Sequence, residues 1–198
     1  MSFDIRPIPL ENTWVRLEPL ARRHAEGLFA IGREAEDWAY LPRPCFETLD
    51  DTRAWIADAQ VLMERNEQIS YAIIDRANGD VAGSTRYLNI RRRDRGLEIG
   101  WTWLGRDFQR SAINTAAKLL LLQHAFDDLN ALRLELKTDG RNLRSQDAIT
   151  RLGATREGVF RRHMIVQDDF IRDTVYFSVT DLDWPLVKAG LLQKLGAR

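Results

Sequence analysis

Residues 96–130 read GLEIGWTWLGRDFQRSAINTAAKLLLLQHAFDDLN, and this stretch predicts a strand, a short turn and a long helix. Residues 97–104 are largely apolar and compatible with a buried strand. Gly105-Arg106-Asp107 interrupts the apolar run. From Thr115 the apolar residues stop alternating, and Leu119 to Leu122 fill more than half a helical turn. We therefore expect a nearly buried helix that lies on a sheet.

A strand that leads through a tight polar turn into a helix is a candidate anion site. The first N–H groups of a helix have no partner within it, and the helix dipole also favours negative charge there. Arg110 and Lys118 could add positive charge, and Thr115 could add a hydroxyl. The alternative interpretation is an ordinary buried helix with an ordinary cap.

Two motifs in this region resemble those of a known family. Residues 109–115, QRSAINT, resemble the Q/R-x-x-G-x-G/A segment of the GCN5-related N-acetyltransferases, which cradles the pyrophosphate of acetyl-coenzyme A. Residues 142–145, NLRS, followed by Leu152-Gly153-Ala154, resemble the N-x-x-S…L-G-F segment of the same family. Either motif alone is weak evidence, whereas their order and spacing together are specific.

Further blocks extend the resemblance over nearly the whole chain, from Thr13 to Trp184. With Glu98-Ile99-Gly100-Trp101 and the ending 177–184, the chain most resembles the ribosomal-protein N-terminal acetyltransferase branch. The resemblance implies an α/β (α+β) fold, a mixed and centrally splayed sheet of about seven strands flanked by helices. Helical and strand patterns elsewhere in the chain agree with this fold, including a hairpin turn at Asn78-Gly79 between strands 69–75 and 81–90.

The resemblance also implies where acetyl-CoA binds. The family holds the cofactor along the strand that contains residues 101–104, where a backbone N–H receives the oxyanion, and holds the diphosphate at the helix start. Asn142 offers amide groups that suit the pantetheine arm. The expected cofactor-binding residues are Trp101, Thr102, Trp103, Leu104, Gln109, Arg110, Ser111, Ala112, Ile113, Asn114, Thr115, Asn142 and Ser145. No metal is expected, because the three histidines show no ligand spacing.

The chain departs from the family pattern at three positions. Ala112 stands where glycine is usual, Asn114 where glycine or alanine is usual, and Ile149 where many members carry a tyrosine acid. We predict that Ala112 has a helical, negative φ, so that its N–H still faces the phosphate. The three departures keep open an alternative of another class, a CoA-binding sensor without catalysis.

Composition limits the remaining possibilities. The 198 residues suit one domain, 1–198, and carry 29 basic and 29 acidic side chains. A zero net charge argues against a general nucleic-acid binder. The single cysteine, Cys45, and the lack of a signal-peptide core favour a reducing, cytoplasmic setting, and no apolar run approaches the ~20 residues of a membrane span.

Acetyl transfer to an amine needs a base, an acid and a site for the oxyanion. Glu98 is the chosen base, because a carboxylate in an apolar strand has a raised pKa. The alternative is a salt bridge to Arg86 or to an arginine of the 91–95 loop. Ser145 is the candidate acid for the thiolate; its alternative role is a hydrogen bond to backbone at a helix start.

The acceptor side is assigned to Trp38, Tyr40, Arg86 and Glu98. Residues 34–46 are rich in aromatic side chains that either wall a substrate pocket or plug the first two helices. A protein or peptide N-terminus is the first choice of acceptor, because an α-amino group has a pKa near ~8, against ~10.4 for lysine. A small-molecule amine is second. The sequence leaves the oligomeric state open, a homodimer included.

Overall fold

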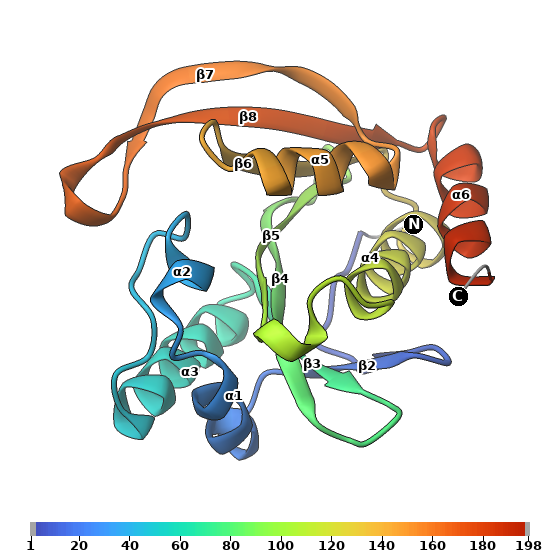
Figure 1. Cartoon of the computed structure of the whole chain (residues 1–198). Coiled ribbons are helices and arrows are strands. Elements are labelled where there is room, and N and C mark those ends of the chain that lie inside the picture. The colour runs from blue at the N-terminus through green and yellow to red at the C-terminus, as the bar shows by residue number, and fades with distance from the viewer. Residues whose placement is uncertain (1–2, 197–198) are drawn as a thin grey trace.

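The computed structural model describes residues 3–196, which form a mixed sheet with helices on both faces (Figure 1). The strand order is β1-β2-β3-β4-β5-β6-β8-β7. This is the expected fold, with an eighth strand because the two-residue β1 joins the edge. The strands are β1 Leu10–Glu11, β2 Val15–Pro19, β3 Ile69–Asp75, β4 Val81–Arg91, β5 Gly96–Leu104, β6 Arg133–Asp139, β7 Thr155–Ile165 and β8 Ile171–Thr180.

Two hydrophobic cores fix the helices on opposite faces of the sheet. One core joins the first three helices to β3 and β5, and the other joins the last three helices to both halves of the sheet. The helices are α1 Ala25–Ile31, α2 Ala35–Trp38, α3 Leu49–Glu64, α4 Ile113–Gln123, α5 Leu143–Leu152 and α6 Trp184–Gly196. The segment 34–46, expected to be a loop, contains the short helix α2. No helix within residues 3–196 has the length and apolar character of a membrane span.

Local signals in the sequence mark the start of α3, the end of α5 and the turn between β3 and β4. The Thr48 side chain accepts a hydrogen bond from the Asp51 N–H at 3.0 Å and caps α3. Gly153 ends α5 with φ 104°, and Gly79 turns the β3–β4 hairpin with φ 82°. Both glycines occupy left-handed backbone that other residues adopt at a cost.

The sheet splits between β5 and β6. These neighbours are parallel, whereas the other strand pairs are antiparallel, and they pair only where Gly96–Glu98 meets Arg133–Glu135. Beyond Glu98 the two strands diverge, and β6, β8 and β7 lie together at the top of Figure 1. From Ile99 onward, the β6-facing edge of β5 therefore has no strand partner.

A bulge in β5 changes the direction of its side chains. Arg86 of β4 pairs with Gly100, but Ser84 pairs with Trp103, so β5 carries one extra residue there. Trp101 lies in this bulge with φ 51°, a left-handed conformation that is rare for a bulky residue. As a result the Trp101 ring lies on the α3 side, over the Arg86 guanidinium, at 4.7 Å.

A widened helical turn follows α4. Residues 124–128 form a π-helical segment. One turn earlier, the Leu121 carbonyl accepts a hydrogen bond from the buried Tyr87 hydroxyl. The neighbouring Tyr71 is equally buried, with its ring centroid 6.2 Å from that of Tyr87, yet its hydroxyl has no partner within residues 3–196.

We expect Tyr87→Phe to lower the free energy of unfolding by about 0.5–1.5 kcal/mol, because it removes a buried hydrogen bond to the Leu121 carbonyl, which keeps the His124 N–H as a donor. Tyr71→Phe is the matched control and should be neutral or stabilising, since it removes a buried hydroxyl that bonds nothing. Denaturant unfolding of both variants provides the comparison. Equal losses of stability in the two variants would contradict the contribution assigned to the Tyr87 hydrogen bond.

Candidate active site

The turn before α4 has the geometry of a helix start without a glycine. Ala112 has φ −71° and ψ −20°, which confirms the predicted helical conformation. The Ser111 hydroxyl donates to the Phe108 carbonyl at 2.6 Å and accepts from the Ile113 N–H at 3.2 Å. Ser111 therefore satisfies the first N–H group of α4, whose N-cap is Ala112, and the following N–H groups of the first turn are left without partners inside the helix.

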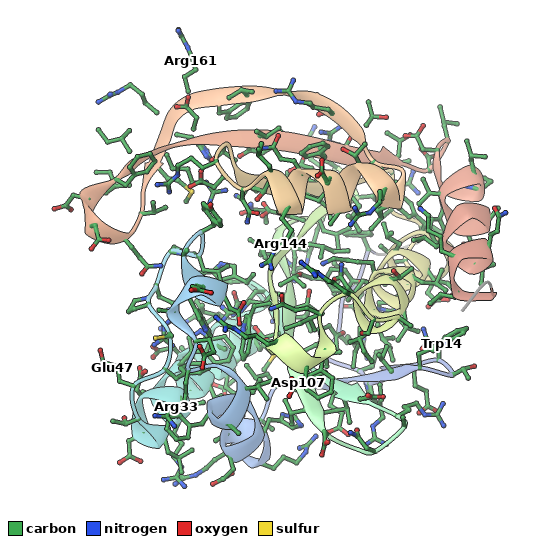
Figure 2. All side chains as sticks on the ribbon, in the orientation of Figure 1. Trp14, Arg33, Glu47, Asp107, Arg144 and Arg161 are labelled. Atoms are coloured by element: carbon green, nitrogen blue, oxygen red, sulfur yellow. The ribbon has the colours of Figure 1, made fainter. Side chains whose placement is uncertain are left out.

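A cleft of about 410 Å³ lies between this turn, α2 and the start of α5. Gln109 occupies the middle of its wall: its amide donates to Asp37 at 2.9 Å and accepts from Arg144 at 3.0 Å. Figure 2 shows Arg144 projecting from α5 toward the turn. The lining residues are Glu36, Asp37, Tyr40, Arg106, Gln109, Arg141, Asn142, Leu143 and Arg144.

The two cations expected near the helix start lie in different places. Arg110 is exposed in the turn, with a left-handed φ of 59°. Lys118 is buried under the bulge of β5, where its Nζ donates to Thr102 Oγ1 at 2.6 Å. Burial lowers the pKa of Lys118 to about 7. The expectation that Lys118 adds charge at the helix start is therefore wrong.

Glu98 is a buried carboxylate with two polar partners. It is 1% exposed, and its Oε2 lies 3.0 Å from Lys137 Nζ and 2.6 Å from Asn89 Nδ2. Burial raises the pKa of Glu98, while the Lys137 ammonium and the Asn89 amide oppose the rise. The alternative prediction named Arg86 or a loop arginine as the salt-bridge partner of Glu98. Glu98 does form a salt bridge, but its partner is Lys137. One signal in the sequence pointed to Lys137, its place on the polar side of an alternating strand.

Asn142 and Ser145 lie at the start of α5. The Asn142 Oδ1 accepts from the Ser145 N–H at 3.0 Å, so Asn142 is the N-cap of this helix. Its Nδ2 remains free to donate into the cleft. The Ser145 hydroxyl is half-buried and bonds no other residue in the range 3–196. Ile149 lies in the core, one turn further along α5.

The side chains of β5 divide between core and cleft. Trp103 and Leu104 are buried in the two cores, so only their backbone can face a ligand. Trp101 and Thr102 are half-buried. Among the residues of the turn, Ile113 is also a core residue, whereas Asn114 and Thr115 are half-buried.

The side chains of residues 34–46, the aromatic loop, also divide between the core and the cleft. Trp38 is fully buried, with ring centroids 4.8 Å from those of Phe46 and Trp103. Its ring packs in the core with residues of α1 and α3, so Trp38 has no exposed surface that could contact a substrate, and its assignment to the acceptor side is wrong. Tyr40 is half-buried and lines the cleft, where the Arg141 guanidinium lies 5.6 Å from its ring.

The tip of the β7–β8 hairpin holds this loop in place. The Gln167 amide donates to the carbonyls of Trp38, Leu41 and Arg43 at 2.9, 2.7 and 2.8 Å. Arg141 adds a second bridge, because its guanidinium lies 3.5 Å from the Phe170 ring. Sequence patterns offered no signal for these contacts, and those of Gln167 join residues more than a hundred positions apart.

Comparisons with known proteins agree on one family. A family model described as "Acetyltransferase (GNAT) domain" matches residues 15–155. A GCN5-related N-acetyltransferase from Brucella melitensis superposes with a TM-score of 0.90 at 31% identity, covering 96% of this chain and 86% of that one. The expected family is confirmed.

Two further proteins are similar to this chain, one in sequence and one in fold. YdaF of Bacillus subtilis strain 168, provisionally named a ribosomal N-acetyltransferase, is 29% identical over 107 residues, or 54% of this chain and 57% of its own length. The microcin C7 self-immunity acetyltransferase MccE, solved with acetyl-CoA and AMP, shares the fold at 23% identity and a TM-score of 0.75, covering 85% and 93% of the two chains.

The raised pKa of Glu98 has a consequence for stability. A carboxyl whose pKa is higher in the folded state binds its proton more tightly there, so its contribution to stability falls as pH rises above the unfolded value of 4.5. We expect the stability of the wild type relative to Glu98→Gln to decline as pH rises through this window. Unfolding of both proteins in denaturant across the pH range measures the difference. A difference that grows with pH would show that the Lys137 pair outweighs burial.

Proposed function

Since this chain belongs to the GNAT family of acetyltransferases, we propose that it moves the acetyl group of acetyl-CoA directly to a primary amine. The unpaired edge of β5, which runs from Glu98 toward the start of α4, carries this proposal. The same edge connects a carboxylate to a helix N-terminus. We further propose that residues 1–198 act as one catalytic domain; a cytoplasmic setting stays a prediction.

Acetyl-CoA fits the route along this edge. The diphosphate would meet the N–H groups of residues 109–115, with Arg144 at the wall of the cleft. The amide-rich pantetheine would lie along the backbone of residues 101–104, which has no strand partner on the side where β6 departs. The free Nδ2 of Asn142 would donate to the same arm.

The reaction needs little more than these groups. The acceptor nitrogen attacks the thioester carbon and its proton passes to Glu98, directly or through a water. A backbone N–H of β5 stabilises the oxyanion, in a site where it needs no reorganisation. The carbon–sulfur bond then breaks, and in this proposal the Ser145 hydroxyl protonates the departing thiolate. Burial favours Glu98 as the base because it raises the pKa of the carboxyl.

The preferred acceptor is the N-terminal amine of a protein or peptide. Its pKa near ~8 makes less demand on a carboxylate base than the ~10.4 of lysine. The name given to YdaF supports the same choice. A small-molecule amine is the second candidate. A CoA-binding sensor is favoured by one observation, the apolar Ile149 in the core where many family members carry a tyrosine acid.

Release of free CoA in the presence of a panel of amines tests the proposal. Turnover with any primary amine supports catalysis, and binding without turnover supports the sensor. Saturating acetyl-CoA should also raise the free energy of unfolding, by about 2.7 kcal/mol at 100 times its dissociation constant. No thermal shift at saturation would refute cofactor binding itself.

Glu98→Gln should lower turnover by about 10²–10⁴ while leaving the dissociation constant of acetyl-CoA unchanged. Glu135→Gln is a matched control, because Glu135 lies on the neighbouring strand but is paired with Arg91 at 2.8 Å. Steady-state kinetics and calorimetric binding separate the two effects. Near wild-type rates in Glu98→Gln across the pH range would assign Glu98 a structural role.

Ala112→Gly should change the binding free energy of acetyl-CoA by less than about 1 kcal/mol. The helical φ of −71° shows that this backbone needs no glycine, and a methyl group in the first turn points away from the axis. Calorimetric titration of the variant checks this. Binding that becomes tenfold tighter, about 1.4 kcal/mol, would mean that the methyl obstructs the site and would strengthen the case for a sensor.

A further inference from the structure

Arg86 is a buried cation without a counter-charge. It is 5% exposed, and no ion pair joins it to an acidic residue anywhere in residues 3–196. Its one hydrogen bond runs from Nη1 to Gln68 Oε1 at 3.3 Å, and its Nε has no partner. Burial, together with the charge of Arg43, lowers the pKa of Arg86 to about 10. Buried charges are normally paired, so this guanidinium has an unmet requirement for an anion.

Two tryptophan rings pack against the Arg86 guanidinium. The Trp55 ring lies 4.9 Å from the guanidinium carbon and the Trp101 ring 4.7 Å. These contacts stabilise the charge through the aromatic faces but use none of its N–H donors. The Trp55 Nε1 is a second buried donor without a partner. Donors are therefore in excess around Arg86, and acceptors are missing.

Arg86 also lies on the same face of the sheet as the proposed base. It pairs across the strands with Gly100, which is two residues from Glu98 on the same face of β5. A Cβ added to Gly100 would come within 3.0 Å of Glu98 Oε1. The glycine thus keeps the space next to the Glu98 carboxylate open. A ligand that crosses Gly100 would meet Glu98 at one end and Arg86 at the other.

We propose that Arg86 binds a carboxylate of the acceptor, which makes the substrate an amine with a carboxylate close to it. This inference rests on the proposed acetyl transfer and names its substrate class. The carboxylate supplies the missing counter-charge and accepts two N–H donors of the guanidinium fork. It belongs either to a free amino acid or to an acidic first side chain of a peptide.

Matched acceptors test the proposal. CoA release is measured with peptides that begin with Asp or with Asn, and with free aspartate or its diamide. We expect kcat/KM to favour the carboxylate member of at least one pair by tenfold or more, and the pair that discriminates identifies the source. Arg86→Gln should remove the preference without changing the dissociation constant of acetyl-CoA. Arg43→Gln, the control, should keep it, because Arg43 already pairs with Asp51 at 3.0 Å.

The remaining outcomes also decide the question. Equal use of both members of every pair by the wild type, with transfer intact, overturns the inference and leaves the proposed function standing. If the wild type acetylates no amine, thermal shifts with the same compounds replace kinetics: stabilisation by the carboxylate member that is lost in Arg86→Gln supports the site, and its absence overturns it. Should Arg86→Gln fail to fold, Arg86→Lys keeps the charge without the fork, and a preference reduced several-fold is expected.

Discussion

The separation of β5 from β6 is the constraint on which the rest of this structure depends. Parallel pairing stops after Glu98, so one edge of a central strand is left without a strand partner. Such an edge in the middle of a sheet is costly unless something else satisfies it. In this chain the edge leads directly to the start of α4, where further N–H groups are unpaired. A ligand rich in amide and phosphate groups answers both requirements at once.

The open sheet keeps its shape because one core spans both of its halves. α4, α5 and α6 pack this core against both halves, and α1, α2 and α3 pack a second core against β3 and β5 on the opposite face. Across the opening, Gln167 holds three carbonyls of the aromatic loop, and Arg141 lies between Tyr40 and Phe170. The contacts of Gln167 and Arg141 bury little surface. The two halves are therefore joined without closing the cleft between them.

The charged groups near the bulge of β5 are unequally satisfied. Glu98 has Lys137 and Asn89 as partners, and Lys118 bonds the Thr102 hydroxyl, whereas Arg86 has two aromatic rings and one long hydrogen bond. Hydrogen bonding and pairing offset the cost of burying a charge, and aromatic faces offset it only in part. The bulge contributes by turning the Trp101 ring toward Arg86, at the expense of a left-handed backbone at a bulky residue.

The sequence by itself determined the local features: the strand, turn and helix of residues 96–130, the Thr48 cap, the Gly153 stop and the family to which the motifs belong. These follow from periodicity and capping, which act within a few residues. The tertiary structure decided which partners the charged groups have. It paired Glu98 with Lys137, placed Lys118 under the bulge, buried Trp38 in the core and left Arg86 unpaired, none of which local pattern specified. The physical reason is that pairing and burial depend on how distant strands are brought together, and on the register shift at Trp101, which reverses the alternation that a regular strand would impose.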